Sequence, residues 1–537
     1  MARGNDRVSR QQIIFMQGFE MKLGHQVQIV AAAAAMWLGA AAPAAAQSTL
    51  NVVLHNDIRN VFPGMSSDNA TGIVLQQVYE GLVAWRENGT VAPMLAKDIQ
   101  VSDDKLSYTF TLRPDVKFHN GAPLTSKEVV WTWQQFLDPK RAWPCRTNFT
   151  GGVVKIEEVT AKDEQTVVFR LAAPAPIFLS LMARSDCDST GIAHPDSINA
   201  EGAIVRGIGT GPFQITEWRR GEYVDLARFP AYVSRTEPAD GLSGAKRAEV
   251  DKVRFVLIPD TNSQKLALQS GAVDIHYSFD ARTADELKAM PGITVDASAI
   301  VSFYAFLMQT SDPILKDVRI RQAIVSAIDY DALRQGVMSY AKGGTSIVPI
   351  STPYYGPVQR QGQTYDLART KRLLQEAGYR GQPITLTTNN NFALMYDTGV
   401  AVQAMLQAAG INAQLEVGEF GSQMSRYYSG RYQMLTWNST PYLDPIFLIQ
   451  RYIGPKATSP EKVWDNPKAV ELINQLMNTT DVAARQPLFD ALHRLFMEDA
   501  PMITWSSNVS VVAYRSRVHG FNAWSGHKPR LWNVSLR

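Results

Sequence analysis

The sequence predicts an α/β fold spread over more than one domain, with mixed sheets flanked by helices. Val253–Ile258, Ser263–Gln269 and Val273–Ile275 make a strand–helix–strand unit, which implies a partly parallel sheet. The 537 residues are too many for one hydrophobic core, so roughly two to four domains are expected. No long linker marks their boundaries, which favours a chain that crosses between domains through short segments.

Local patterns predict the elements of the first half. Apolar side chains at helical spacing predict a helix over Asp68–Val83. Thr125 followed three residues later by Glu128 is a capping box, which starts another helix. Alternation of apolar and polar residues predicts strands and hairpins. The expected strands are Thr49–Leu54, Tyr108–Leu112, Val153–Val159, Thr166–Leu171, Phe213–Glu217 and Tyr223–Arg228.

The second half continues the alternation of strands and helices. The helix Thr398–Ala409 is closed by Gly410. The other expected elements are the strands Ile384–Thr387, Ala413–Val417, Gln433–Trp437 and Val509–Tyr514 and the helices Lys468–Asn478 and Ala483–Glu498. The Gly-rich segment Gly207–Phe213 does not fit a dinucleotide-binding loop, because Pro212 blocks the helix start that such a loop feeds.

The N-terminus has the features of an export signal. Lys22 precedes the apolar, Ala-rich run Val27–Ala46, and the small residues Ala44 and Ala46 fit the cleavage pattern of a signal peptide. The alternative is a transmembrane anchor, but the run is short and rich in alanine rather than leucine. A start at Met21 gives a more ordinary signal length. We expect cleavage after Ala46 and a periplasmic location.

Composition and motifs exclude several classes of protein. Removal of residues 1–46 takes away four cations and two anions and leaves a formal net charge of +1. This charge gives no case for a nucleic acid or an acidic membrane surface as partner. The sequence lacks a nucleophile elbow, an HExxH motif, a Walker loop and a CxxC motif. We expect no enzymatic activity, no cofactor and no metal site; a cell-envelope enzyme is the alternative of another class.

Cys145 and Cys187 are the only cysteines. In an oxidising compartment such a pair is more often bridged than free. We therefore expect a disulfide between them, and the alternative is two separate buried thiols. Two cysteines alone do not make a zinc site.

An ordered set of segments carries a resemblance to one family. The set consists of Tyr79–Val130 (with YEGL, APMLA, SYTFTLR, VKFHNG and PLTSKEVV), Gly207–Phe213, Val253–Ile275 and Asp317–Leu333. In this order the segments resemble those of the bacterial extracellular solute-binding proteins of family 5, the peptide, nickel and opine receptors of ABC importers. The resemblance covers nearly the whole chain after the signal segment. Its motifs are diagnostic as a set and weak one at a time.

The resemblance implies a two-lobed periplasmic-binding-protein fold. Such a fold is a hinged clamshell of mixed sheets flanked by helices, here with an extra α+β domain. The expected parts are a signal peptide (1–46), a first lobe in three pieces (47–88, 205–292 and 505–537), the extra domain inserted in it (89–204) and a second lobe (293–504). The resemblance also implies a monomeric receptor that captures a solute and delivers it to an ABC permease and ATPase complex at the inner membrane.

The best candidate for ligand contacts is the segment Leu435–Pro445, because ligands of α/β sheets lie beyond strand ends. In peptide-binding members of the resembled family, an acidic residue about three positions after the Trp holds the peptide's ammonium group. Thr440 stands there, or Ser439 if the loop is shifted, so this anchor is expected to be absent. The expected ligand-binding residues of the segment are Trp437, Asn438, Ser439, Thr440 and Tyr442.

A second charged anchor is also expected to be absent. Peptide-binding members carry an Arg ahead of the helix that corresponds to Thr398–Ala409, where this chain has Thr388–Phe392. Asn389 and Asn391 offer neutral donors and acceptors, and Tyr396 lies near them. The loss of both charges favours a non-standard peptide, a sugar conjugate or an opine-like solute. A receptor for di- or oligopeptides is the alternative within the family.

Aromatic residues elsewhere leave two readings open. Phe303, Tyr304 and Phe306 lie at an expected crossing between lobes, where one of them lines the cleft or all pack in the core. Tyr79 and Glu80 lie at the end of a helix near the expected hinge, and for these a structural role is favoured.

Overall fold

The computed structural model describes residues 47–537 except 67, 142, 186–189, 278, 280 and 339. The expected signal peptide, its cleavage site after Ala46 and the alternative start at Met21 lie outside the described residues. Within the described part of the chain, no helix is long and apolar enough to cross a membrane.

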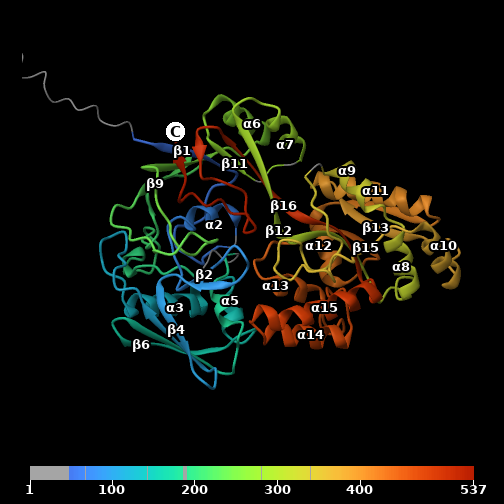
Figure 1. Ribbon diagram of the computed structural model, residues 1–537, viewed down its shortest axis with the longest axis horizontal. Coiled ribbons are helices and arrows are strands. Elements are labelled where there is room, and N and C mark those ends of the chain that lie inside the picture. The colour runs from blue at the N-terminus through green and yellow to red at the C-terminus, as the bar shows by residue number, and fades with distance from the viewer. Residues whose placement is uncertain are drawn as a thin grey trace, which may run out of the picture. The chain divides into compact units, whose positions relative to one another are not determined.

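Ten strands form one mixed sheet in the order β14-β13-β15-β12-β16-β11-β1-β10-β9-β8 (Figure 1). Strand β1 pairs in parallel with β10 and β11, and β13 pairs in parallel with β14 and β15. The expected partly parallel sheet is therefore confirmed. Its strands are β1 (Thr49–Leu54), β8 (Phe213–Arg219), β9 (Tyr223–Arg228), β10 (Lys252–Leu257), β11 (Ile275–Tyr277), β12 (Ile293–Met308), β13 (Ile384–Asn389), β14 (Ala413–Gly418), β15 (Met434–Asn438) and β16 (Met502–Arg515).

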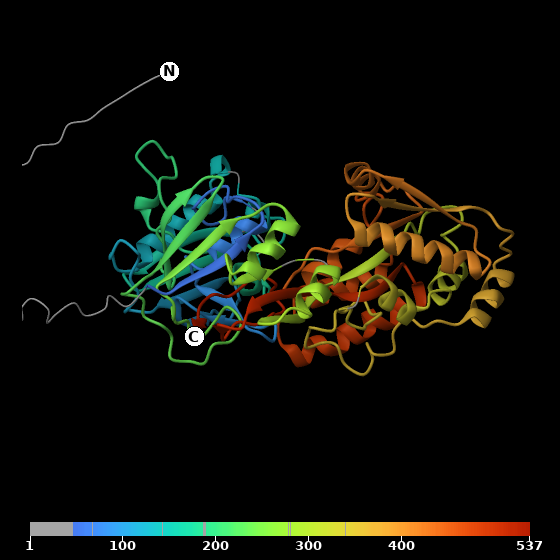
Figure 2. The same ribbon diagram turned by 90° about the horizontal axis from the view of Figure 1, so that it is seen from above.

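Two long antiparallel strands, β12 and β16, join the halves of this sheet. They pair from Ile293 with Arg515 to Leu307 with Met502, with an irregular register between Ala299 and Phe303. The far end of β16 pairs with β11, whereas the far end of β12 pairs with β15. We call the half around β1 and β8–β11 the first lobe and the half around β13–β15 the second lobe. Figure 2 shows the blue-to-green and the yellow-to-orange elements on opposite sides, with the red strand β16 between them.

The first lobe carries a smaller antiparallel sheet in the order β4-β5-β7-β6. The capping box is confirmed, because the Thr125 and Glu128 side chains each bond the other's backbone at the start of α3. The expected domain boundaries at 89 and 204 enclose this sheet and stay a prediction. The elements are β4 (Ala96–Val101), β5 (Ser107–Leu112), β6 (Ile156–Asp163), β7 (Thr166–Leu171), α3 (Ser126–Leu137), α4 (Arg146–Phe149) and α5 (Phe178–Met182).

Shorter elements complete the first lobe. They are α2 (Asn69–Leu75), β2 (Val83–Trp85), β3 (Val91–Pro93), α6 (Thr261–Ser270), α7 (Ala281–Lys288), β17 (Val518–His519), β18 (Ser535–Leu536) and the 3-10 turns Pro139–Arg141 and Pro195–Ser197. The expected helix Asp68–Val83 was wrong in its length, since α2 ends at Leu75. Beyond it, the carbonyls of Gln77 and Val78 accept bonds from Phe213 and Gly211 instead of continuing the helix.

Helices cover the second lobe. Several of them are capped by acidic or amide side chains, among them Asp317 for α8 and Asn466 for α14, which accept bonds from backbone N–H groups. The helices are α8 (Val318–Ser326), α9 (Tyr330–Val337), α10 (Leu367–Glu376), α11 (Ala393–Ala408), α12 (Phe420–Ser429), α13 (Pro445–Ile449), the 3-10 turn Gln450–Tyr452, α14 (Pro467–Met477) and α15 (Val482–Asp499).

Candidate functional site

A cleft of about 590 Å³ lies where the two lobes meet the crossing strands. The second lobe contributes the loop after β15, and the first lobe contributes the start of α2, the end of β11 and a late loop. Its walls are formed by Asp68, Asn69, Tyr277, Phe279, His527 and Lys528 of the first lobe, Asn438–Pro441 of the second lobe, and Ile300, Tyr304 and Asn508–Val511 of the crossing strands. The cleft therefore collects side chains from segments that are far apart in sequence.

Neutral polar groups dominate the side of the second lobe. Asn438 and Thr440 are exposed to the cleft. The Nδ2 of Asn508 donates to Oδ1 of Asn438 at 2.9 Å, which ties the crossing strand β16 to the loop after β15. Ser510 lies on the same strand and lines the same space. These side chains offer donors and acceptors without a net charge.

Aromatic rings form another part of the wall. Tyr304 stacks on Trp505, with ring centroids 5.1 Å apart and planes at 23°. Of the three aromatic residues expected at the crossing, Tyr304 lines the cleft, whereas Phe303 and Phe306 are buried in the core. Of the two readings left open by the sequence, the structure therefore supports the one in which one of the three residues lines the cleft.

The charged side chains of the cleft wall are engaged with protein groups. Asp68 caps α2: one carboxylate oxygen accepts from Thr71 N at 2.8 Å, and the other accepts from the Thr71 hydroxyl at 2.7 Å and from the Ser66 hydroxyl. Burial raises the pKa of Asp68, but the bonds from Ser66 and Thr71 outweigh it and hold the pKa below its usual value. Lys528 Nζ donates to the carbonyl of Ser185 at 2.6 Å.

The loop after β15 places only part of the expected set in the cleft. Asn438, Ser439 and Thr440 line it. The hydroxyl of Ser439 donates to the Phe303 carbonyl at 2.5 Å, so it fixes the loop against β12. Trp437 lies in the core of the second lobe instead. Its Nε1 donates to the Tyr452 hydroxyl at 2.9 Å, and its ring is 4.3 Å from that of Tyr427.

Tyr442 lines a separate cavity of about 30 Å³ beside the cleft. Its hydroxyl accepts from Arg451 at 2.9 Å, and the guanidinium of Arg184 lies 5.8 Å from its ring centroid. Lys528 lies between the two spaces and lines both.

The side chains of the expected asparagines near α11 accept hydrogen bonds from backbone N–H groups. Asn389 is fully buried; its Oδ1 accepts from Phe392 N at 3.0 Å. The Oδ1 of Asn391 accepts from Phe420 N at 2.8 Å. Tyr396 is 40% exposed on α11. These three residues do not line the cleft of the described chain, so the structure does not bring them together with Asn438 and Thr440.

Sequence reasoning missed several residues of the cleft wall. Tyr277 ends the three-residue strand β11, Phe279 follows that strand, and Asn508 and Ser510 lie within β16. His527 and Lys528 come from a loop near the C-terminus. The pairing of β11 with β16, of β16 with β12 and of β12 with β15 brings Tyr277 and Asn508 toward the loop after β15. The position of Tyr277 at a strand end was the one available signal.

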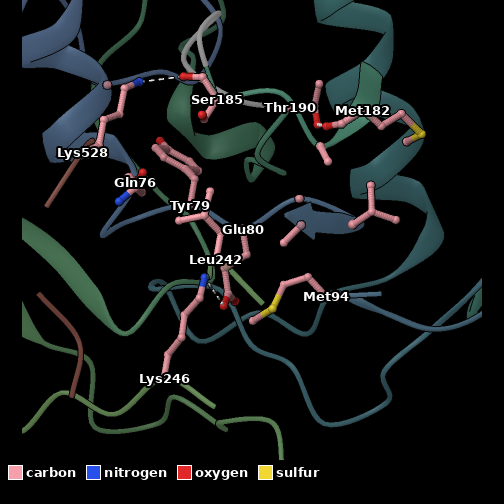
Figure 3. A pocket seen from close by; sticks show the side chains of 15 residues that line it. Gln76, Tyr79, Glu80, Met94, Met182, Ser185, Thr190, Leu242, Lys246 and Lys528 are labelled. Carbon is pink, nitrogen blue, oxygen red and sulfur yellow. Dashed lines mark hydrogen bonds and ion pairs between the residues drawn. The ribbon is translucent and has the colours of Figure 1, made fainter. Parts of the chain in front are cut away.

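A smaller internal cavity of about 50 Å³ lies within the first lobe (Figure 3). On its wall Glu80 forms a buried ion pair with Lys246 at 3.4 Å. The carboxylate also accepts from the Tyr232 hydroxyl at 2.8 Å and from the Thr210 hydroxyl at 3.1 Å. Burial lowers the pKa of Lys246, although Glu80 opposes the shift. This network is consistent with the structural role expected for Glu80.

Cys145 takes part in a disulfide. Cys187 lies outside the described residues, so its pairing with Cys145 stays a prediction. Among the residues that the structure covers, no group of three or more His, Cys, Asp or Glu side chains is placed to hold a metal ion.

A cleft lined by two lobes, which two crossing strands connect, defines a class of proteins that close around a solute. Comparison with protein families matches residues 90–459 to the bacterial extracellular solute-binding proteins, family 5 Middle. The chain belongs to this family, as the sequence predicted. The family consists of solute-binding proteins whose members bind small solutes or peptides and work with an ABC permease and ATPase.

Relatives and solved structures agree with this assignment. The glutathione-binding protein GsiB of Escherichia coli K12 is 24% identical over 93% of this chain and 96% of that protein. HbpA2 from Haemophilus parasuis has a TM-score of 0.80 at 22% identity, covering 91% of this chain and 100% of its own. AgaA from Agrobacterium tumefaciens R10, solved with agropinic acid, has a TM-score of 0.68 at 23% identity, covering 91% and 99%. These structural matches confirm the two-lobed fold.

Proposed function

We propose that this protein is the periplasmic receptor of an ABC importer, and that it captures a small polar solute in the cleft between its lobes. The observation that carries the proposal is the shared wall of the cleft: Tyr277 comes from the first lobe, Asn438 and Thr440 from the second, and Asn508 from a crossing strand. A volume of about 590 Å³ suits a small molecule.

Closure of the lobes is the proposed mechanism of capture. The lobes are joined through β12 and β16, whose irregular register near Ala299 and Phe303 offers a place to bend. A solute that contacts Asn438 on one side and Tyr277 on the other stabilises the closed form, because both contacts exist together only when the cleft is shut. The closed form would then dock on the membrane permease.

The neutral wall favours a non-standard peptide, a sugar conjugate or an opine-like solute. Thr440 offers a hydroxyl where peptide receptors of the family carry an acid. Among the described residues of the wall, the one carboxylate is that of Asp68, which caps α2. The relatives named for glutathione, a peptide with a non-standard linkage, support this class, as does the neighbour solved with agropinic acid. A di- or oligopeptide receptor is the second candidate.

Calorimetric titration of the mature protein with glutathione, agropinic acid and the dipeptide Met-Leu tests the proposal. We expect saturable 1:1 binding of glutathione or agropinic acid, a raised melting temperature and a smaller radius of gyration in solution scattering. Tighter binding of Met-Leu than of the other two would favour the peptide receptor. Absence of binding by all three would contradict the proposed function.

The expected export and division of the chain belong to the same proposal. We propose cleavage after Ala46, a first lobe formed by 47–88, 205–292 and 505–537, an inserted domain of 89–204 and a second lobe of 293–504. Mass spectrometry of the protein purified from the periplasm of its host tests the cleavage site, with an N-terminus at Gln47 as the expected result.

A further inference from the structure

We propose that the Tyr277 hydroxyl contacts the solute directly and donates a hydrogen bond to an acceptor oxygen of it, either a carboxylate or a carbonyl oxygen. This inference rests on the proposed function. It adds the chemical group that the solute presents to the first lobe.

Tyr277 lies in the wall of the cleft and next to one of the two strands, β12 and β16, that join the lobes. It is the last residue of β11 and pairs with Val512 of the crossing strand β16. The residue lines the cleft, and only 1% of it is exposed. Phe279, two positions further on, lines the same space. A solute held here lies against the strand about which the lobes move.

The orientation of Tyr277 is set by His55. The two rings meet edge to face, with centroids 4.8 Å apart and planes at 87°. The amide Nε2 of Gln264 lies 3.0 Å from His55 Nδ1 and can only donate, so Nδ1 accepts. The proton of the neutral imidazole is then on Nε2, which donates to the Tyr277 carbonyl at 2.9 Å. Burial lowers the pKa of His55 and keeps the ring neutral.

The hydroxyl of Tyr277 is buried, and the described chain offers it no hydrogen-bond partner. An unpaired buried hydroxyl costs free energy that a phenylalanine at the same place would avoid. Burial also raises the pKa of Tyr277, so the group keeps its proton and acts as a donor. A hydroxyl held in this way gains its partner when an acceptor oxygen enters the cleft.

The opposite wall completes the site. Asn438 and Thr440 of the second lobe face the cleft with amide and hydroxyl groups. An oxygen-rich solute that bonds Tyr277 on one side and these residues on the other joins the two lobes. Such a bond from Tyr277 also adds selectivity, because a solute without an acceptor oxygen leaves the hydroxyl unpaired.

The substitution Tyr277→Phe removes the hydroxyl and keeps the ring. Tyr432→Phe is a matched control: Tyr432 is also buried with a hydroxyl unpartnered among the described residues, but it does not line the cleft. Titration of both variants and the wild type uses glutathione, agropinic acid and Met-Leu. We expect Tyr277→Phe to raise the Kd of each probe that the wild type binds by about tenfold, and Tyr432→Phe to leave it unchanged.

The melting temperature of the free proteins provides a second readout. Loss of the hydroxyl from a purely structural tyrosine would lower this temperature. We expect Tyr277→Phe to melt at or above the temperature of the wild type, since the substitution removes an unpaired group. A lower melting temperature for the free variant would mean that the hydroxyl already has a partner, and the inference would be overturned.

Unchanged binding by Tyr277→Phe, with a wild type that does bind, would also overturn the inference while leaving the proposed function intact. A wild type that binds none of the three probes overturns the proposed function and the inference with it. Analogues of a bound probe that lack one carboxylate at a time identify the oxygen. If the difference between wild type and variant disappears with the loss of one carboxylate, the partner is that carboxylate; if it remains in every such analogue, the partner is a carbonyl oxygen.

Discussion

Arg485 and Asp444 form a buried two-point ion pair, in which Nη1 and Nη2 of the arginine each lie 2.9 Å from a carboxylate oxygen. The residues are 3% and 1% exposed. Asp444 also caps α13 by accepting from Ile446 N at 3.0 Å, and Arg485 donates to the Tyr354 hydroxyl at 2.9 Å. The pair therefore holds the end of the loop that contributes Asn438–Pro441 to the cleft.

Replacement of this arginine is expected to destabilise the protein strongly. Arg485→Met leaves the Asp444 carboxylate buried without its cation, which typically costs about 3–5 kcal/mol. Urea unfolding measures the free-energy change. The control is Arg319→Met, because Arg319 pairs with Asp317 at a more exposed position. Loss of this pair should lower the free energy of unfolding by about 1 kcal/mol or less. Equal losses for the two variants would contradict the role assigned to the buried pair.

Gly209 is expected to tolerate no side chain. A Cβ at this position would lie 2.1 Å from the Val78 carbonyl oxygen, where the backbones of the two segments touch. Gly209→Ala should lower the free energy of unfolding by about 2 kcal/mol or more. Gly421→Ala is the control, because its Cβ meets nothing within 4 Å and the residue lies in α12. This control should leave stability unchanged or raise it by about 0.5–1 kcal/mol.

His276 is expected to make stability depend on pH. The residue is fully buried, and burial, with a smaller effect of His55, lowers its pKa to about 3. Between about pH 6.5 and 3 the unfolded chain binds a proton here and the folded chain does not. The contribution of neutral His276 to the free energy of unfolding is therefore complete above pH 6.5. It is lost as the pH falls below this value, by about 1.4 kcal/mol per pH unit.

Chemical unfolding at pH 7.5, 6 and 5 checks this expectation. His276→Phe should lose less stability than the wild type over that range. His519→Gln, at an exposed position, should follow the wild type. Parallel curves for the wild type and His276→Phe would show that this imidazole does not cause the dependence.

Thr440 is expected to control the preference for a solute ammonium group. The side chain is exposed in the cleft, so Thr440→Asp places a carboxylate there without burying it. The variant should bind the free ammonium group of Met-Leu about tenfold more tightly than the wild type does, a gain of about 1.4 kcal/mol. Thr440→Asn is the neutral control. Equal affinities of the Asp and Asn variants for Met-Leu in calorimetry would rule out this role of position 440.

Local signals in the sequence predicted much of the fold. The capping box of Thr125 and Glu128 and the hairpin of β8 and β9 depend on neighbouring residues, and both are present. The α2 helix ended early because Gln77 and Val78 bond to the distant residues Gly211 and Phe213, which no local pattern encodes. Element boundaries failed where tertiary hydrogen bonds replaced helical ones.

The cleft was harder to predict for the same reason. Asn438 and Thr440 follow a recognisable strand end and line the cleft. Trp437 directly precedes Asn438 in β15. Because successive side chains of a strand point to opposite faces, Trp437 is buried in the core instead. Asn389 has a local role instead, since its Oδ1 accepts from the N–H of Phe392 just ahead of α11. Tyr277 becomes a wall residue only because β11 lies beside β16.

The place of β16 in the ten-stranded sheet has a consequence for biogenesis. This strand, Met502–Arg515, separates β12 from β11, so without it the sheet divides into two unconnected parts. A nascent chain cannot join its lobes until this late segment has left the ribosome. We therefore expect the two parts of the sheet to remain unjoined until synthesis of the chain is nearly complete.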